Sequence, residues 1–117
     1  VHKPHNKPSE ACLNRKYTEN QLFKYSALTM NSHRIHYDVD YCKTVEYYPS
    51  LVVHGPLLAQ NLIDAADQRF EGGLQYFKYR ALNPIFVSDE FSINTSDTAE
   101  FWVTDKSGVL SMSAVAS

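Results

Sequence analysis

The chain contains few of the residues that cross-link small secreted proteins. Its 117 residues include only two cysteines, Cys12 and Cys42. Two cysteines cannot form a disulfide framework, so we expect free thiols in a reducing compartment, with one bridge between them as the alternative. There are also no internal repeats and no low-complexity segments, which leaves an ordinary single globular domain as the expected class.

Strong charge and long apolar runs are also missing. The net charge is −2 and the isoelectric point is about 6.2, which argues against a nucleic-acid-binding domain. No apolar run approaches the roughly 20 residues that a membrane span needs, so no membrane partner is expected. No hydrophobic signal segment opens the chain, and we expect no export. Because residue 1 is valine, we expect a processed product or a fragment of a longer protein.

The composition that is present, 44% hydrophobic and 13% aromatic residues, suits one modest core. Residues 1–16 are polar and contain two prolines, which predicts an extended arm that ends in a short strand near residues 15–17. Residues 17–117 are then the folded domain. Thr18 and Gln21 have the spacing of a capping box, which predicts a helix over 19–29. A second short helix is expected over 38–47.

A wide apolar stripe predicts one long central helix. The segment LVVHGPLLAQNLIDAADQRF is the most helical of the chain, and Pro56 suits a first helical position, which places the helix over 55–70. After Gly72 and Gly73 the spacing of apolar residues changes from the period of a helix to the alternation of a strand, in which every second residue is apolar. The strands expected from this alternation cover residues 74–82, 90–94, 100–105 and 109–116, with a hairpin turn over 105–108. Together they predict an α+β layer in which an antiparallel sheet wraps around the helix.

The stretch TMNSHRIHYD concentrates polar residues between two predicted helices. His33 and His36 are three residues apart, and His54 is a third histidine that a metal site would need. A His-x-x-His pair alone is a weak zinc signal, so no metal is expected. Asn31 and His36 are also suited to capping a loop. The third interpretation is acid–base chemistry, since a histidine accepts or delivers a proton near neutral pH.

The triplet His54-Gly55-Pro56 favours acid–base chemistry. It lies at the predicted start of the long helix, where backbone N–H groups are unpaired at the positive end of the helix dipole. Such a position can hold a carbonyl oxygen on which negative charge develops. An imidazole together with a helix N-terminus is therefore suited to chemistry next to a carbonyl group.

These segments resemble a known family. YSALTMNSHRIHYD followed by LVVHGPLLAQ is similar to the MaoC-like (R)-specific enoyl-thioester hydratases and dehydratases. The resemblance is greatest to the branch with mesaconyl-C4-CoA hydratase and the hydroxyacyl-thioester dehydratases type 2. FKYRALNPIFVSDEF and AEFWVTDKSGVLSMSAVA resemble the same branch. The resemblance implies a hot-dog fold and the reversible addition of water to the double bond of an acyl-CoA or acyl-carrier thioester, without a metal or organic cofactor.

The resemblance also implies roles for individual residues. The family loop Asp-x-Asn-Pro-x-His places Asn31 at the aspartate position, His33 at the asparagine, Arg34 at the proline and His36 at the final histidine. Only His36 matches this pattern, while the closer branch has the Asn-x-His-Arg-Ile-His form. His36 is the expected proton handler, and Asn31 is expected to orient the water. His33 or Asp38 is the candidate for the missing base.

Further residues are expected to contact the substrate. The Gly55 N–H matches the family's donor to the thioester carbonyl. His54 is expected either to shape the pocket or only to lead the chain into the helix. Arg34 either meets a phosphate or carboxylate or is a solvated charge, and His33 is a substrate-side neighbour. Asp64 is the nearest carboxylate for a third interpretation, a hot-dog thioesterase.

The resemblance covers the C-terminal half of a double hot-dog protein. We therefore expect a homodimer or a complex with a separate hot-dog half. The alternative to the hydro-lyase is a non-catalytic hot-dog module that binds acyl thioesters or forms the structural half of a heteromer. The expected location is the cytoplasm for a bacterial source and the mitochondrial matrix for a eukaryotic one.

Overall fold

One antiparallel sheet organises the chain. The computed structural model describes residues 11–96 and 99–117. The strand order is β1-β3-β4-β5-β2, and every neighbouring pair is antiparallel. The strands are β1 (Ala11–Arg15), β2 (Phe77–Ala81), β3 (Phe91–Thr95), β4 (Glu100–Thr104) and β5 (Leu110–Ala116). The predicted α+β class and the four strands after the long helix are confirmed.

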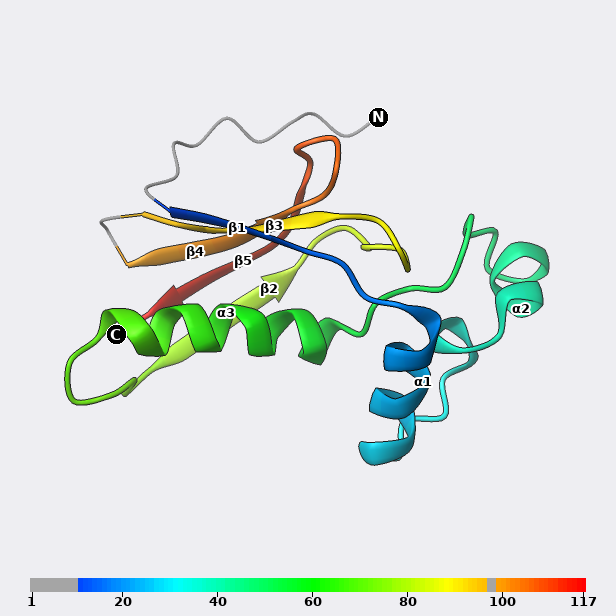
Figure 1. Ribbon diagram of the computed structural model, residues 1–117, viewed down its shortest axis with the longest axis horizontal. Helices are drawn as coiled ribbons and strands as arrows, with labels where there is room; N and C mark the ends of the chain where they lie inside the picture. Colours follow the sequence, from blue (N-terminus) through cyan, green and yellow to red (C-terminus); the bar gives the residue numbers. More distant parts are fainter. Residues whose placement is uncertain (1–10, 97–98) are drawn as a thin grey trace.

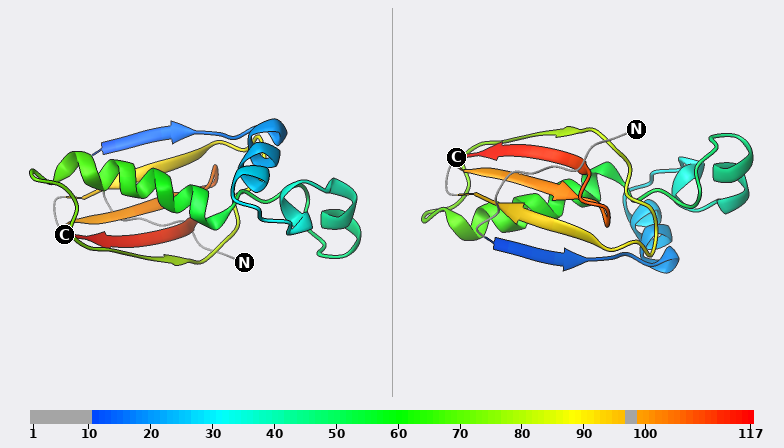
Figure 2. Two further views of the ribbon diagram at one scale, coloured as in Figure 1. Left: turned by 90° about the horizontal axis from the view of Figure 1, so that it is seen from below. Right: turned by 90° about the horizontal axis from the view of Figure 1, so that it is seen from above.

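Helix α3 (Gly55–Arg69) lies along one face of this sheet (Figures 1 and 2). It contacts β2, β3, β4 and β5, and the core lies between the helix and the strands. The side chains with no measurable exposure in this core include Leu62, Ala66, Phe91, Phe101 and Met112. The wide apolar stripe of the sequence is therefore the face that α3 presents to the sheet, as predicted.

A helical extension projects from one end of the sheet and helix (Figure 1). It consists of α1 (Glu19–Leu28), the 3-10 helix η1 (Arg34–His36) and α2 (Val39–Thr44). The predicted capping box is present, because the Gln21 N–H donates to Thr18 Oγ1 at 3.3 Å and the Thr18 N–H donates to Gln21 Oε1 at 2.8 Å. Helix α2 is shorter than predicted, and Tyr47, with φ of 59°, takes the left-handed backbone conformation soon after it ends.

The first strand begins earlier than the sequence predicted. Residues 11–15 pair along β3, from Ala11 opposite Thr95 to Arg15 opposite Phe91. This corrects the strand predicted near 15–17, because pairing with a distant strand, rather than local hydrophobicity, orders these residues. Residues 1–10 of the predicted arm lie outside the described residues, as does the side chain of Cys12. Cys42 is a buried free thiol.

The segment before α3 is extended and bonds to both the helical extension and the residues that follow β2. The Val53 N–H donates to the Ile85 carbonyl at 2.8 Å, and the Val52 N–H donates to the Ile35 carbonyl at 2.9 Å. These bonds attach the helical extension to the segment between β2 and β3, directly before the helix begins at Gly55. Among the helices that the structure describes, none combines the length and apolar character that crossing a membrane requires.

Candidate active site

The two sequence motifs meet at the junction of the extension and α3. His36 is the last residue of η1, and His54 is the N-cap residue of α3. Their rings are stacked, with centroids 3.8 Å apart and planes inclined by 17°. The predicted proton handler and the predicted helix start therefore lie in contact, although they are 18 positions apart in the chain.

The hydrogen bond of the His36 ring uses one nitrogen and leaves the other unbonded among the described residues. Nδ1 lies 2.6 Å from the carbonyl oxygen of Val52, and a carbonyl only accepts, so Nδ1 carries the proton. Nε2 then has a lone pair, and it makes no hydrogen bond to any described residue. Burial lowers the pKa of His36; the Val52 carbonyl opposes this effect and a charge on His33 adds to it. His36 is therefore a neutral base at physiological pH.

His54 is fully buried and faces away from solvent. Its Nε2 lies 2.7 Å from the Oγ of Ser26, and the edge of the Tyr25 ring meets it with centroids 4.7 Å apart. Burial and the adjacent His36 lower the pKa of His54 to about 4. Sequence reasoning missed Ser26. Its spacing four residues after Leu22, which puts both on the buried face of α1, is a signal that could have identified it.

Gly55 presents free space at the start of α3. The first N–H groups of a helix have no partner within it, and no described residue accepts from the Gly55 N–H. A Cβ added at Gly55 would meet nothing within 4 Å, so this backbone is open to a ligand. Gly55 lines a hollow of about 250 Å³ together with Leu58 and Ser111.

Asn31 and His33 form a local turn next to this site. The Asn31 N–H donates to the Ser26 carbonyl at 2.8 Å, and Asn31 Oδ1 accepts the His33 N–H at 3.1 Å. The loop-capping interpretation of Asn31 is therefore confirmed for its oxygen. Asn31 lines a second hollow, of about 360 Å³, with Ser26 and Met30, and not the hollow beside Gly55. The exposed His33 ring meets His36 edge-on, with centroids 5.9 Å apart.

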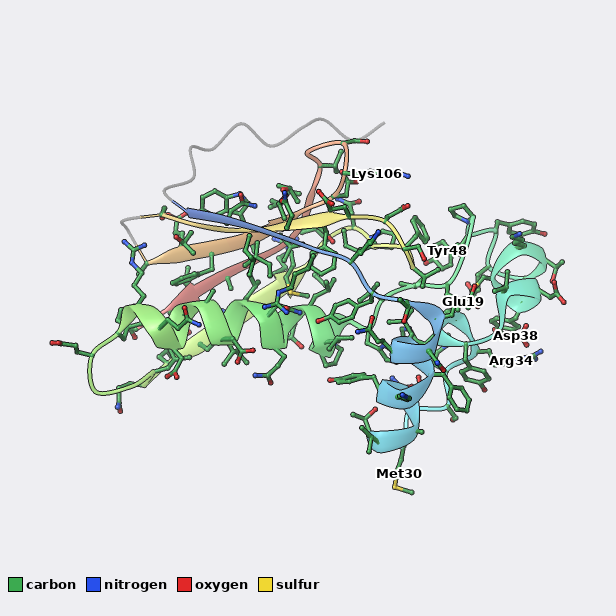
Figure 3. All side chains as sticks on the ribbon, viewed as in Figure 1. Glu19, Met30, Arg34, Asp38, Tyr48 and Lys106 are labelled. Carbon is green, nitrogen blue, oxygen red and sulfur yellow. The ribbon has the colours of Figure 1, made fainter. Side chains whose placement is uncertain are left out.

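Arg34 and Asp38 neutralise each other (Figure 3). Arg34 Nη2 lies 2.8 Å from Asp38 Oδ2, and the guanidinium lies 4.5 Å from the centre of the Tyr41 ring. Asp38 also accepts the Tyr41 N–H at 3.0 Å and caps α2. The hydrogen bonds from Tyr41 and Arg34 lower the pKa of Asp38. Asp38 is thus a structural carboxylate here, and Arg34 would have to leave it to reach an anion.

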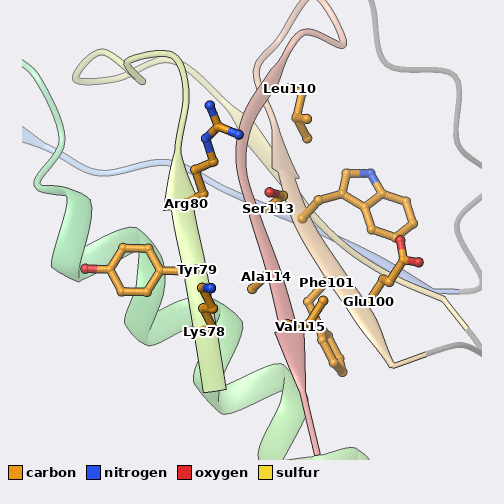
Figure 4. A pocket seen from close by; sticks show the side chains of 10 residues that line it. Lys78, Tyr79, Arg80, Glu100, Phe101, Leu110, Ser113, Ala114 and Val115 are labelled. Carbon is orange, nitrogen blue, oxygen red and sulfur yellow. The ribbon is translucent and has the colours of Figure 1, made fainter. Parts of the chain in front are cut away.

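Other candidate groups lie apart from this junction. Asp64 on α3 is exposed and accepts a hydrogen bond from Gln60 at 3.0 Å. The described residues contain no group of three or more histidine, cysteine or acidic side chains placed to hold a metal ion. A hollow of about 390 Å³ lies over β2, β4 and β5, lined by residues that include Lys78, Arg80 and Ser113 (Figure 4). None of the predicted site residues lines it.

Comparisons with known proteins identify relatives of this chain. Residues 1–87 match the family described as hydroxyacyl-thioester dehydratase type 2. The mesaconyl-C(4)-CoA hydratase of Chloroflexus aurantiacus is 48% identical over 65 residues, which are 56% of this chain and 23% of that protein. The mitochondrial hydroxyacyl-thioester dehydratase type 2 of Schizosaccharomyces pombe is 34% identical over 85 residues, 70% of this chain and 28% of that protein. This chain thus spans about a quarter of the length of these relatives.

Solved structures share the fold at low sequence identity. An (R)-hydratase from A. caviae superposes with a TM-score of 0.76 and 19% identity over 95% of this chain and 94% of that one. A MaoC-like dehydratase from Phytophthora capsici gives a TM-score of 0.70 and 17% identity over 99% of this chain and 44% of that one. The predicted hot-dog fold is confirmed. With the match over residues 1–87, this means that the chain belongs to the hydroxyacyl-thioester dehydratase type 2 family.

Proposed function

We propose that this chain forms the catalytic part of a hydro-lyase that adds water to, or removes it from, an acyl thioester. The observation that carries the proposal is the 3.8 Å stack of His36 on His54, which puts an imidazole with a free nitrogen at the N-terminus of α3. This reaction requires a group that transfers a proton and a donor that stabilises the developing oxyanion. Membership of the family and the names of its relatives support the same chemistry.

In the hydration direction, Nε2 of His36 takes a proton from water while the water oxygen bonds to the β-carbon of the enoyl thioester. The electron pair of the double bond moves toward the thioester carbonyl, whose oxygen becomes negative. The Gly55 N–H donates to that oxygen. His36 then returns the proton to the α-carbon, which gives the 3-hydroxyacyl thioester and the neutral imidazole. Dehydration follows the same steps in reverse.

Asn31 is the proposed water-orienting residue. Its Oδ1 is occupied by the His33 N–H, whereas its Nδ2 has no hydrogen bond to a described residue. The Nδ2 group is therefore available to donate to the oxygen of the attacking water. An amide does not take up a proton at neutral pH, so His36 alone handles protons in this proposal.

The substrate and the assembly belong to the same proposal. The thioester is carried by CoA or an acyl carrier, with a mesaconyl-like acid among the candidates, and the site is completed by a second hot-dog unit. Similar folds occur in the ChsH1–ChsH2 and HadBC complexes of Mycobacterium tuberculosis, and the P. capsici chain is more than twice as long as the part matched. Two relatives are named as mitochondrial, which supports the matrix for a eukaryotic source; the cytoplasm is proposed for a bacterial one.

The substitution His36→Gln tests this function. Glutamine fills a similar volume but cannot take a proton, so the rate of hydration should fall by about 10²-fold or more. The rate is followed as the loss of enoyl absorbance with crotonyl-CoA or mesaconyl-CoA. Asp40→Asn, on the exposed side of α2, is the control and should leave the rate unchanged.

Turnover by the His36→Gln protein at the rate of the unmodified chain would remove His36 from the mechanism. If the unmodified chain is stabilised by CoA thioesters in a thermal shift but does not turn them over, the non-catalytic module is the better description.

A further inference from the structure

Ser26 and His54, two polar residues from separate elements, are hydrogen-bonded to each other, and the His54 ring stacks on His36. Ser26 comes from the middle of α1 and His54 from the residue before α3, and their side chains are 6% and 0% exposed. The 2.7 Å bond between Ser26 Oγ and His54 Nε2 therefore lies in the interior. Burying a polar group destabilises the folded state unless the group is hydrogen-bonded, so this bond is part of what the fold requires at this position.

The environment of His54 selects one tautomer of its ring. Nδ1 is buried and has no hydrogen-bond partner in the described part of the chain. A buried N–H without an acceptor is rarer in proteins than an acceptor that lacks a donor. The proton consequently belongs on Nε2, from which it is donated to the Ser26 hydroxyl. His54 is a neutral ring whose orientation depends on one serine.

That ring is one of the contacts that orient His36. The Val52 carbonyl holds Nδ1 of His36 at one edge, and the face of His54 supports the imidazole plane. A single hydrogen bond would still allow the ring to rotate about it. The stack removes this freedom, so Nε2 stays on the side opposite Val52, where no described residue bonds to it.

We propose that Ser26 and His54 are positioning residues: the Ser26 hydroxyl orients the His54 ring, and this ring holds the His36 imidazole with Nε2 toward the substrate. The inference rests on the proposed function, because it requires His36 to be the proton handler. In this proposal neither side chain acts on the substrate directly. Both act through the geometry and the environment of His36.

The electrostatic setting agrees with this role. The groups in ring or hydrogen-bond contact with His54 are Tyr25 and Ser26 of α1 and His36 of η1, with His33 beyond His36. None of them brings a negative charge to His54 at neutral pH, and burial keeps the pKa of His54 at about 4. A neutral ring can lie against His36 while His36 gains and loses its proton, whereas a second cation would oppose that step.

The first test uses ¹⁵N NMR of the histidine rings in the unmodified chain. We expect His54 to remain neutral with its proton on Nε2 between about pH 5 and 8, the range in which an ordinary histidine titrates. A proton on Nδ1, or a titration of His54 together with His36, would overturn the proposal. This test needs neither turnover nor a variant.

The second test compares Ser26→Ala with Ser26→Thr, which keeps the hydroxyl. Ser26→Ala should lower kcat by roughly tenfold or more while KM stays constant, because a misplaced base loses rate without losing substrate contacts. The acid limb of the kcat profile should move toward the ordinary histidine pKa of about 6.5 as the loosened rings admit water. Ser26→Thr should restore both. Thr29→Ala, which removes a hydroxyl bonded to the Tyr25 carbonyl at 2.7 Å, is the control and should leave both unchanged.

Wild-type kcat and pH profile in Ser26→Ala, or equal losses in the alanine and threonine variants, would overturn the positioning role. Circular dichroism of each variant identifies one that fails to fold, and in that case the NMR result on the unmodified chain decides. If His36→Gln abolishes turnover but Ser26→Ala does not change it, only this inference fails. If His36→Gln keeps full turnover, the proposed function fails first.

Discussion

At the scale of single residues, three histidines of the same chain have different environments. His33 is exposed, His36 is 7% exposed with one nitrogen bonded, and His54 is fully buried. Burial disfavours the charged imidazolium, so it lowers the pKa of His36 and lowers that of His54 further, to about 4. Of these three, His36 is the one that lies at the edge of the interior with its Nδ1 proton fixed by the Val52 carbonyl and with Nε2 unprotonated. This difference between neighbours is what makes one of them suitable for proton transfer.

The low pKa of His54 predicts that folding weakens in mild acid. Below the unfolded pKa of about 6.5 the unfolded chain takes up a proton that native His54 does not take until about pH 4. The free energy of unfolding should therefore fall by about 3 kcal/mol through this term as the pH decreases from 6.5 to 4. Urea unfolding at several pH values, followed by circular dichroism, measures the change.

His54→Gln is the reference for this prediction, since it removes the titrating group and retains a polar side chain beside Ser26. The carboxylates and His36 titrate in both proteins, so the difference between the two pH curves isolates His54. Parallel curves for the two proteins would contradict the assignment of a buried neutral His54.

At the scale of elements, α3 depends on small side chains where it meets the sheet. Ala59 and Ala66 are 3% and 0% exposed, and Leu62 lies between them on the same face. Alanine at these positions lets the helix backbone approach the strands closely. Asn61 of α3 is also buried, and its Nδ2 donates to Tyr17 Oη at 2.8 Å.

Ala66→Leu should destabilise the protein because it adds volume where α3 packs without free space. Overpacking of this kind costs about 1–3 kcal/mol, visible as a lower urea midpoint at unchanged slope. Asp67→Leu introduces the same side chain at the next, exposed position and should change stability by no more than about 0.5 kcal/mol. Equal effects of the two substitutions would show that close packing at residue 66 is not limiting.

At the scale of the whole molecule, a sheet with helix α3 on one face carries a helical extension at one end (Figures 1 and 2). Strand β2 is an edge strand that pairs only with β5 among the described strands, and most of its residues are exposed. Tyr76, Tyr79 and Leu82, on and beside this edge, are 52%, 44% and 40% exposed. An unpaired strand edge with exposed apolar groups is suited to pairing with another chain.

We expect the isolated chain to associate through this edge into a particle of twice its 13.4 kDa mass. Size-exclusion chromatography with light scattering measures that mass. Tyr79→Glu should shift the protein toward the monomer, because a carboxylate would be buried in the interface. Tyr47→Glu, the same exchange at a tyrosine that is 83% exposed near α2, should leave the mass unchanged. A monomer at micromolar concentration, or dissociation by Tyr47→Glu instead, would contradict an interface formed through the edge of β2.

Local patterns accounted for the elements that carry their own signals. Thr18 and Gln21 predicted the start of α1, Pro56 the start of α3, and alternation the strands β3 to β5. The same reasoning failed for residues 11–15, since β1 is ordered by pairing with β3, about 80 residues away. It also overextended α2 and β2, because element ends depend on backbone conformation and partners as much as on side-chain periodicity.

For the site, the sequence by itself determined the residue types: a histidine pair on a loop, and a histidine and a glycine before a long helix. Which atoms meet was decided only by the tertiary structure, which stacked His36 on His54 and bonded Ser26 beneath them. It also paired Arg34 with Asp38 and turned the oxygen of Asn31 toward its own loop. The physical reason is that reactivity depends on burial and hydrogen-bond partners, and those come from elements distant in the chain.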